Sequence, residues 1–305
     1  MARAAANVAM ISRTHGQPAS PTTMGKELAV FNYRLGRQLQ RLNRQPILAK
    51  FNGAVGNYNA HTSACPKVDW KAVSKDFIEN KIGLTWNPLT TQIESHDAMV
   101  ELFDVLNLVN SILIDFSRDI WGYISLGYFV QKTVASEVGS STMPHKVNPI
   151  YFENAEGNLG VSNSLLAHFS QKLPISRWQR DLSDSTVLRT WGSAFGHAVL
   201  AYKNLLRGLE RLTLNPQVMR EELEGSWELL AEPVQTVMRR YGVIDAYDRL
   251  KLATRGSAVV TKEMIHAAID GCPEIPDSER TRMKDWTPPN YTGLAAQLAL
   301  EAFDP

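Results

Sequence analysis

Residues 97 to 129 read DAMVELFDVLNLVNSILIDFSRDIWGYISLGYF, and this stretch decides the fold class. Apolar side chains recur in it at steps of three and four residues, which predicts one amphipathic helix. They are Leu102, Leu106, Val109, Leu113, Phe116, Ile120 and Ile124. At a rise of about 1.5 Å per residue, such a helix is roughly 50 Å long. Its apolar flanks are wider than one neighbouring helix could cover, so we expect it to pack inside a bundle and against other copies of the chain. The prediction is an all-α protein.

Helical spacing continues on both sides of this stretch. It predicts helices over residues 23–44, 68–81, 149–173 and 191–212. Residues 47–61 break the period with glycines and asparagines, which predicts a short hairpin or an irregular crossover, and the alanine-rich residues 1–11 are expected to form the end of a helix. After residue 212, short amphipathic segments alternate with glycine and proline. We therefore predict a central long-helix domain over residues 1–212 and a small helical C-terminal domain over residues 213–305.

Composition argues against several classes of partner. Lys and Arg number 32 against 31 Asp and Glu, so there is no general basic field for nucleic acid. Charged residues interrupt the most apolar stretch, residues 99–129, which argues against a membrane span. Cys65 and Cys272 are far apart in the sequence, which suits a reducing cytoplasm and predicts neither a disulfide framework nor a metal site.

Gly139 to Pro149 read GSSTMPHKVNP, the stretch richest in chemistry. Ser140 and Ser141 bring two hydroxyls and Lys146 brings a cation. Asn148 can cap a helix whose first residue is Pro149, because that position needs no N–H partner. Free N–H groups at a helix start, with an ammonium beside them, stabilise an anion. The stretch therefore predicts either a serine acting on an anionic substrate or, more plainly, a surface loop with a solvated lysine.

This stretch resembles the signature loop of the fumarase/aspartase superfamily of lyases, which eliminate fumarate from succinyl compounds. The resemblance places the loop at residues 136–149. It implies that Ser140 is the base that removes the proton next to a carboxylate. It also implies that Ser141, Lys146 and Asn148 bind substrate.

Ser12 to Pro21 form a polar turn, SRTHGQPASP, that is rich in glycine and proline. A histidine in such a turn is often only a hydrogen-bonded structural residue. However, THGQPASP is similar to a second stretch of the same superfamily. In its adenylosuccinate lyase branch, the resemblance implies that His15 is the general acid that protonates the leaving nitrogen, with Thr14 binding substrate. An imidazole suits that task because its usual pKa lies near neutrality.

Two further segments hold residues that the resemblance assigns to substrate. The TTQIE sequence around Gln92 is similar to the adenylosuccinate lyase segment whose glutamine contacts substrate. Asn154 and Asn158 lie one turn apart on the helix expected over residues 149–173, so they share a face, and Asn154 is close enough to the loop to reach substrate. The plain alternatives are a solvated amide and two exposed asparagines.

Ser176 to Arg189 read SRWQRDLSDSTVLR, with Arg180, Ser185 and Arg189 in an R-x4-S-x3-R spacing. We expect Asp184 or Ser185 to cap a new helix, with Ser185 at its start and Arg189 one turn in. A hydroxyl, helix N–H groups and guanidiniums would then converge as a phosphate requires. Alone, such a pattern is more often a surface helix cap with ion pairs. It resembles the adenylosuccinate lyase pattern that holds a nucleoside monophosphate and a substrate carboxylate.

The resemblance covers nearly the whole chain and implies adenylosuccinate lyase activity, giving AMP and fumarate in purine biosynthesis without a cofactor. It also implies a homotetramer with active sites shared between subunits, acting on succinyl nucleotides. Family members have a further N-terminal domain, so this chain alone is expected to be incomplete. Two alternatives stay open: another fumarate-releasing lyase, of the argininosuccinate lyase or fumarase type, and a non-catalytic oligomeric scaffold.

Overall fold

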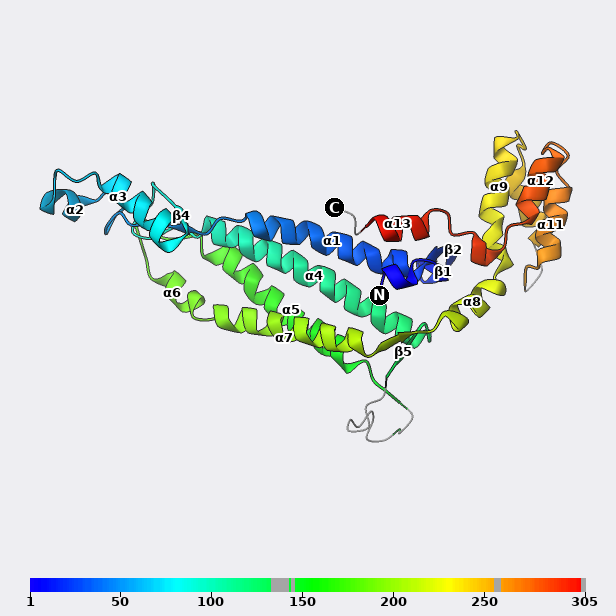
Figure 1. Cartoon of the computed structure of the whole chain (residues 1–305), viewed down its shortest axis with the longest axis horizontal. Coiled ribbons are helices and arrows are strands. Elements are labelled where there is room, and N and C mark those ends of the chain that lie inside the picture. Colours follow the sequence, from blue (N-terminus) through cyan, green and yellow to red (C-terminus); the bar gives the residue numbers. More distant parts are fainter. Residues whose placement is uncertain (133–142, 144–145, 255–258, 303–305) are drawn as a thin grey trace. The chain divides into compact units, whose positions relative to one another are not determined.

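The computed structural model describes residues 1–132, 143, 146–254 and 259–302 (Figure 1). The chain forms two compact units, each built from separate segments. One unit comprises Met1–Tyr33, Tyr123–Val130 and Thr213–Pro305, and the other comprises Arg34–Gly122 and Gln131–Leu212. We call them the hairpin unit and the bundle unit. The sequence analysis expected two consecutive domains, whereas here the first residues of the chain group with the last. Both divisions have a boundary at residue 213.

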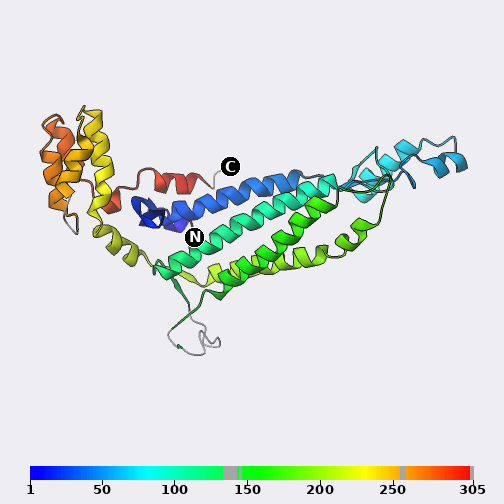
Figure 2. The ribbon, with the colours of Figure 1, turned by 180° about the vertical axis from the view of Figure 1, so that it is seen from behind.

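Long helices form the bundle unit. They are α4 (Asp97–Ser125), α5 (Ile150–Lys172), α7 (Trp191–Glu210) and the second half of α1 (Met24–Arg44). Helices α4, α5 and α7 run side by side in both ribbon views (Figures 1 and 2). One apolar cluster joins these three helices through Phe103, Leu166, Phe169, Leu173 and Ala194. The all-α prediction is confirmed, and the helices expected over residues 23–44, 97–129, 149–173 and 191–212 are present within a few residues of their expected bounds.

Small residues allow α5 and α7 to approach closely. A Cβ added to Gly208 of α7 would lie 2.8 Å from the Phe152 ring of α5, and that ring is almost fully buried. Polar groups then link α4, α5 and α7 in the interior. Asn110 is fully buried, donates to the Ser162 hydroxyl at 3.2 Å and accepts from the Tyr202 hydroxyl at 2.5 Å. Burial raises the pKa of Tyr202 to about 12. Because each buried polar group has a partner, the network favours one register of the three helices.

The remainder of the bundle unit consists of short elements. They are α2 (Asn59–Ala64), α3 (Trp70–Asp76), the π-helical segment η2 (Phe77–Ile82), α6 (Ser183–Leu188) and the strands β3 (Leu48–Ala49) and β4 (Thr85–Trp86). Asp69 caps α3 by accepting from the Ala72 amide at 3.1 Å. Gly83 ends η2 in the left-handed region, with φ +77°, as expected for a C-terminal glycine. β3 and β4 pair in parallel, so residues 47–61 are a crossover rather than a hairpin.

The hairpin unit contains a β-hairpin and the short C-terminal helices. After the 3-10 turn η1 (Arg3–Ala5), β1 (Ala9–Thr14) and β2 (Gln17–Thr23) pair antiparallel. The following elements are α8 (Pro216–Glu224), η3 (Trp227–Leu230), α9 (Ala231–Arg240), α10 (Ala246–Thr254), α11 (Lys262–Asp270), α12 (Asp277–Lys284), η4 (Pro288–Asn290) and α13 (Ala295–Glu301). Strands β5 (Phe129–Gln131) and β6 (Leu212–Leu214) lie where the chain passes between units. A separate core of the C-terminal helices includes Leu230, Val234, Met238, Ile265 and Ile269.

One local expectation was wrong. Residues 1–11 are not the end of a long helix, because the 3-10 turn covers only three residues and β1 begins at Ala9. Met10 and Ile11 are buried, and Met10 pairs with Thr22 across the hairpin. Long-range pairing and burial therefore override the helix preference of the alanines. No helix among the described residues is long and apolar enough to cross a membrane.

Candidate active site

His15 lies at the tip of the β-hairpin in the hairpin unit. Thr14 pairs with Gln17, so His15 and Gly16 form a two-residue loop. Both loop residues have positive φ, +55° for His15 and +73° for Gly16, as in the tight turns that match strand twist. His15 is exposed. The turn predicted around this histidine is confirmed, and it presents the imidazole to solvent.

Three side chains anchor this hairpin to the rest of its unit. Arg13 of β1 donates to the Tyr128 hydroxyl at 3.2 Å and pairs with the Glu222 carboxylate of α8. Tyr128 is fully buried and its hydroxyl also donates to Glu222. Burial, reinforced by the bond to Glu222, raises the pKa of Tyr128 to about 12. Arg13, two positions before His15, is thus held by charge-assisted hydrogen bonds. The sequence analysis singled out none of these three residues.

Gln92 and Arg180 lie together in the bundle unit. Arg180 Nη1 donates to the side-chain oxygen Oε1 of Gln92 at 3.3 Å. The backbone N–H of Gln92 donates to the Gln179 carbonyl at 3.3 Å. Asp184 faces the same guanidinium, with 3.6 Å between Asp184 Oδ1 and Arg180 Nη2. The Asp184 carboxylate is buried, and this ion pair helps to orient Arg180. Two residues assigned separately to substrate therefore form one polar site.

The helix after Arg180 begins differently from the prediction. α6 starts at Ser183, and neither Asp184 nor Ser185 caps it. Instead, Asp181 Oδ1 accepts from the Ser183 amide at 2.8 Å and from its hydroxyl at 2.5 Å. These bonds, together with those from Arg177, hold the pKa of Asp181 well below its usual range. An aspartate two residues before the helix takes the place expected of a cap, because its carboxylate reaches forward to the first turn.

Ser185 and Arg189 consequently lie at opposite ends of a helix of one and a half turns. Ser185 is half-buried in the first turn, whereas Arg189 is exposed and follows the last helical residue. Among the described residues, neither of them is hydrogen-bonded to Arg180. Their convergence on one phosphate stays a prediction.

Most of the signature loop lies outside the described residues, and this includes Ser140 and Ser141. Lys146 is exposed, and its amide donates to the Met143 carbonyl at 3.0 Å. Asn148 is half-buried, but it does not cap α5. Pro149 occupies the capping position and α5 begins at Ile150, so the expected helix start was wrong by one residue.

Asn154 and Asn158 share a face of α5, as predicted. The Asn158 amide donates at 2.9 Å to both the carbonyl and the side-chain oxygen of Asn154. From α7, Asn204 donates to the Asn154 side chain and His197 Nδ1 donates to Asn158 Oδ1 at 2.7 Å. The sequence analysis did not single out His197, yet it belongs to this polar contact between two helices.

Lys50 was also missed by the sequence analysis. Its ammonium donates to the Gln92 carbonyl at 2.6 Å and to the Gly53 carbonyl at 2.7 Å. Burial lowers the pKa of Lys50. No motif surrounds this lysine, and only the long-range pairing of β3 with β4 brings it to Gln92.

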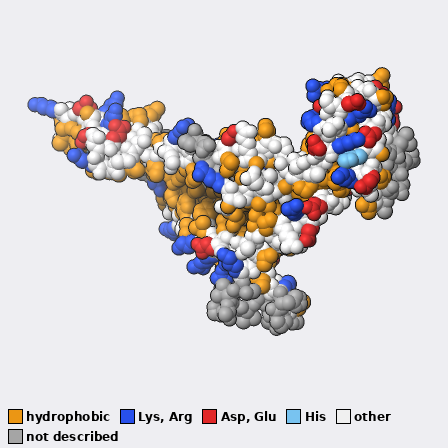
Figure 3. All heavy atoms as spheres, turned by 45° about the vertical axis from the view of Figure 1, so that its right-hand side comes forward, with side chains coloured by type: hydrophobic (Ala, Val, Ile, Leu, Met, Phe, Trp, Pro, Cys, Tyr) orange, Lys and Arg blue, Asp and Glu red, His pale blue; other side chains and the backbone are white. Residues whose placement is uncertain are grey.

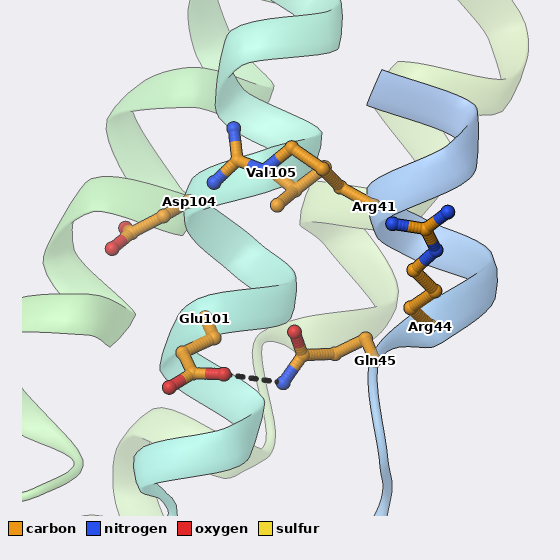
Figure 4. A pocket seen from close by; sticks show the side chains of 6 residues that line it. All are labelled: Arg41, Arg44, Gln45, Glu101, Asp104 and Val105. Carbon is orange, nitrogen blue, oxygen red and sulfur yellow. Dashed lines mark hydrogen bonds between the residues drawn. The ribbon is translucent and has the colours of Figure 1, made fainter. Parts of the chain in front are cut away.

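A cavity of about 470 Å³ lies elsewhere in the bundle unit, between the end of α1 and the start of α4 (Figure 4). Its lining includes two arginines, Arg41 and Arg44, and two carboxylates, Glu101 and Asp104. Glu101 accepts from Gln45 at 2.7 Å. The opposite charges compensate one another, and no predicted substrate residue lines this cavity. Within the described ranges there is also no cluster of His, Cys, Asp and Glu that could hold a metal ion.

Two family models match the chain in succession. Residues 1–161 match the model described as "Lyase", and residues 176–292 match the model described as "Adenylosuccinate lyase C-terminal". The curated adenylosuccinate lyases of Vibrio cholerae serotype O1 and Escherichia coli K12 are 56% and 55% identical over 96% and 97% of the chain. The chain spans 64% of the length of each of these relatives.

Two solved structures resemble the fold of this chain. A 3-carboxy-cis,cis-muconate lactonizing enzyme from Pseudomonas putida matches with a TM-score of 0.72 at 25% identity, covering 99% of this chain and 67% of its own. A fumarate lyase from Mesorhizobium sp. BNC1 matches with a TM-score of 0.72 at 22% identity, covering 99% of this chain and 68% of its own. The second likeness concerns the fold alone.

Proposed function

We propose that this chain, which belongs to the lyase family, carries the activity of an adenylosuccinate lyase. The reaction is elimination of fumarate from adenylosuccinate, giving AMP, and from succinyl-aminoimidazole-carboxamide ribotide in purine biosynthesis. The match of residues 176–292 to the adenylosuccinate lyase C-terminal model and the names of the curated relatives support this substrate class over other succinyl compounds.

The contact between Arg180 and Gln92 is the structural observation that carries the proposal. A planar guanidinium binds carboxylate or phosphate oxygens through two parallel hydrogen bonds, and the side-chain amide nitrogen of Gln92 adds a further donor. The buried Asp184 holds the guanidinium, so its orientation is set before substrate binds. A succinyl nucleotide carries a phosphate and two carboxylates, and it therefore offers this site several matching groups.

Acid and base roles in the proposal come from the resemblance of the two motifs. Ser140 removes a proton from the carbon next to a carboxylate, and electrons then move to break the carbon–nitrogen bond. His15 protonates the departing nitrogen, so that AMP leaves as a neutral amine. Lys146 and Asn148 stabilise the negative charge that develops on the carboxylate.

The remaining proposed substrate contacts are assigned in the same way. Thr14, Ser141 and Asn154 bind the succinyl part. Ser185 and Arg189 bind the phosphate together with Arg180, which requires the exposed Arg189 side chain to fold back over α6. Of this set, Asn154 already uses its side-chain oxygen for Asn158 and Asn204. Its amide nitrogen is therefore the group left for substrate.

The proposed assembly is a homotetramer with active sites shared between subunits. Exposed apolar side chains on the long helices support it (Figure 3). In the bundle unit they include Leu39, Leu108, Trp121, Val161, Val199, Leu200 and Leu206. Such a surface is characteristic of a protein interface rather than of a monomer. We place the protein in the cytoplasm, since Cys65 and Cys272 are both free thiols.

Fumarate release from a panel of substrates tests the proposed function. The full-length protein is expected to release fumarate from adenylosuccinate and not from argininosuccinate or malate. Release from argininosuccinate or malate alone would assign a different lyase activity. An assembled protein that releases fumarate from none of them would support the scaffold alternative.

A further inference from the structure

The segment that carries Gln92 lies directly against the segment that follows β3. The parallel pairing of Ala49 with Trp86 starts this contact, and the Asn87 amide continues it by donating to the Ala49 carbonyl at 2.8 Å. Residues 50–56 and 87–92 then run on as two loops in contact. The loop of residues 50–56 is here called the clamp, because three of its residues hold the loop of Gln92.

Lys50 is the first of the three contacts. Its ammonium joins the carbonyl of Gly53, within the clamp, to the carbonyl of Gln92, at distances of 2.7 Å and 2.6 Å. A charged donor shared by two carbonyls is a strong hydrogen bond. Because Arg180 contacts the side chain of Gln92 while Lys50 contacts its backbone, the residue is held at both ends.

Asn52 is the second contact. Its side chain is fully buried. The side-chain nitrogen donates to the Thr90 hydroxyl at 2.9 Å, and the side-chain oxygen lies 3.3 Å from the same hydroxyl, within reach as an acceptor. The Asn52 carbonyl accepts from the Tyr58 amide at 2.8 Å, which fixes the clamp on its other side. A buried amide with its partner in place specifies one arrangement of the two loops.

Gly56 is the third contact, and it is steric. A Cβ at this position would lie 2.0 Å from the Thr90 carbonyl oxygen and 3.1 Å from the Thr91 carbonyl oxygen. Gly56 also has φ +85°, a conformation that L side chains rarely adopt. Only glycine therefore allows the clamp to lie this close to the residues that precede Gln92.

We propose that Lys50, Asn52 and Gly56 are positioning residues that set the place of Gln92 in the substrate site. This inference rests on the proposed function for the identity of the substrate and for the role of Gln92 in binding it. The clamp itself predicts a fixed Gln92 loop whatever that substrate is. A loop that is displaced by a fraction of an ångström loses the orientation of the Gln92 amide relative to Arg180.

Two matched pairs of variants test the clamp in the full-length protein. Gly56→Ala is compared with Gly83→Ala, because Gly83 has a similar φ of +77° but nothing within 4 Å of an added Cβ. Lys50→Met, which keeps length but removes the donor, is compared with Lys50→Arg, which restores it. Circular dichroism establishes that each variant is folded. Lys50→Met needs no backbone change, so it remains informative if Gly56→Ala fails to fold.

The first measurement is the hydrogen-exchange rate of the backbone amides of residues 87–92. The backbone N–H of Gln92 donates to the Gln179 carbonyl at 3.3 Å, so its exchange rate reports on the loop directly. Gly56→Ala and Lys50→Met are expected to speed exchange there, while Gly83→Ala and Lys50→Arg leave it unchanged. The second measurement is the KM for adenylosuccinate, which should rise roughly tenfold in the first two variants with kcat little changed, the pattern of lost uniform binding.

An unchanged hydrogen-exchange rate of residues 87–92 in both Gly56→Ala and Lys50→Met would overturn the proposed role of the clamp. Faster exchange with an unchanged KM would also overturn it, because Gln92 would then be displaced without consequence for substrate. If the wild-type protein releases no fumarate from succinyl nucleotides, the proposed function fails. The exchange measurement still decides in that case whether the clamp holds the Gln92 loop.

Discussion

Arg180 reaches Gln92 across 3.3 Å although 88 residues separate them in the chain. Each of the two residues has a second contact. Asp184 faces the Arg180 guanidinium, and Lys50 donates to the backbone carbonyl of Gln92. A guanidinium held between a carboxylate and an amide keeps donors free for a ligand, because it carries five N–H groups. This pair therefore offers free donors to an anionic ligand.

Arg180→Ala should weaken the binding of AMP or adenylosuccinate by about 1.5–3 kcal/mol, the range for a hydrogen bond to a charged group. Arg177→Ala is the matched control, since Arg177 is largely exposed and pairs with Asp181 instead. Titration calorimetry measures both affinities. Equal losses in the two variants would mean that only general surface charge matters.

Ser140→Ala should lower kcat by roughly 10²-fold or more, because it removes the proposed base. The fold should be unchanged, as judged by circular dichroism. Ser141→Ala is the neighbouring control and should act mainly on KM. If Ser141→Ala instead abolishes turnover and Ser140→Ala does not, the base is the second serine of the pair.

His15→Asn should lower kcat by about 10²- to 10⁴-fold while keeping the hairpin, since it removes the acid and asparagine tolerates positive φ. The comparison with His15→Ala separates chemistry from turn geometry, because alanine is disfavoured at φ +55°. Turnover is measured with adenylosuccinate under saturating conditions. Full activity in His15→Asn would leave the histidine a structural role only.

Gly208→Ala should destabilise the protein by about 1–3 kcal/mol, the cost of overpacking, because its Cβ would meet the buried Phe152 ring at 2.8 Å. Gly196→Ala on the same helix is the control. Nothing lies within 4 Å of its added Cβ, so helix propensity should stabilise it by up to about 1 kcal/mol. Urea unfolding gives both changes, and a stabilised Gly208→Ala variant would contradict the close packing of α5 on α7.

Sequence periodicity predicted the long helices because their apolar positions repeat over many turns, as in α4. It failed at residues 9–14, where the strand depends on pairing with β2 rather than on local preference. The resemblance of their motifs predicted a substrate role for Gln92 and Arg180, which the structure brings into contact, but it gave no reason to include Lys50. The contact of Lys50 with Gln92 follows from the parallel pairing of β3 with β4, which joins segments 37 residues apart in register.

The cap of α6 shows a subtler limit of the sequence. Asp184 and Ser185 have the residue types of a helix cap, and so does Asp181, which actually receives the bonds from Ser183. With Ser183, four suitable residues lie within five positions, and they cannot be ranked by type alone. In the structure Asp184 faces the Arg180 guanidinium, whereas the Asp181 carboxylate reaches the helix start.

Product stoichiometry tests most directly whether the protein cleaves a succinyl nucleotide, as proposed. The full-length protein is incubated with adenylosuccinate, and AMP and fumarate are quantified by chromatography in parallel with the Ser140→Ala variant. We expect AMP and fumarate in equal amounts from the wild type and little of either from the variant. Wild-type protein that forms neither product, or a Ser140→Ala variant that forms both at the wild-type rate, would contradict the account.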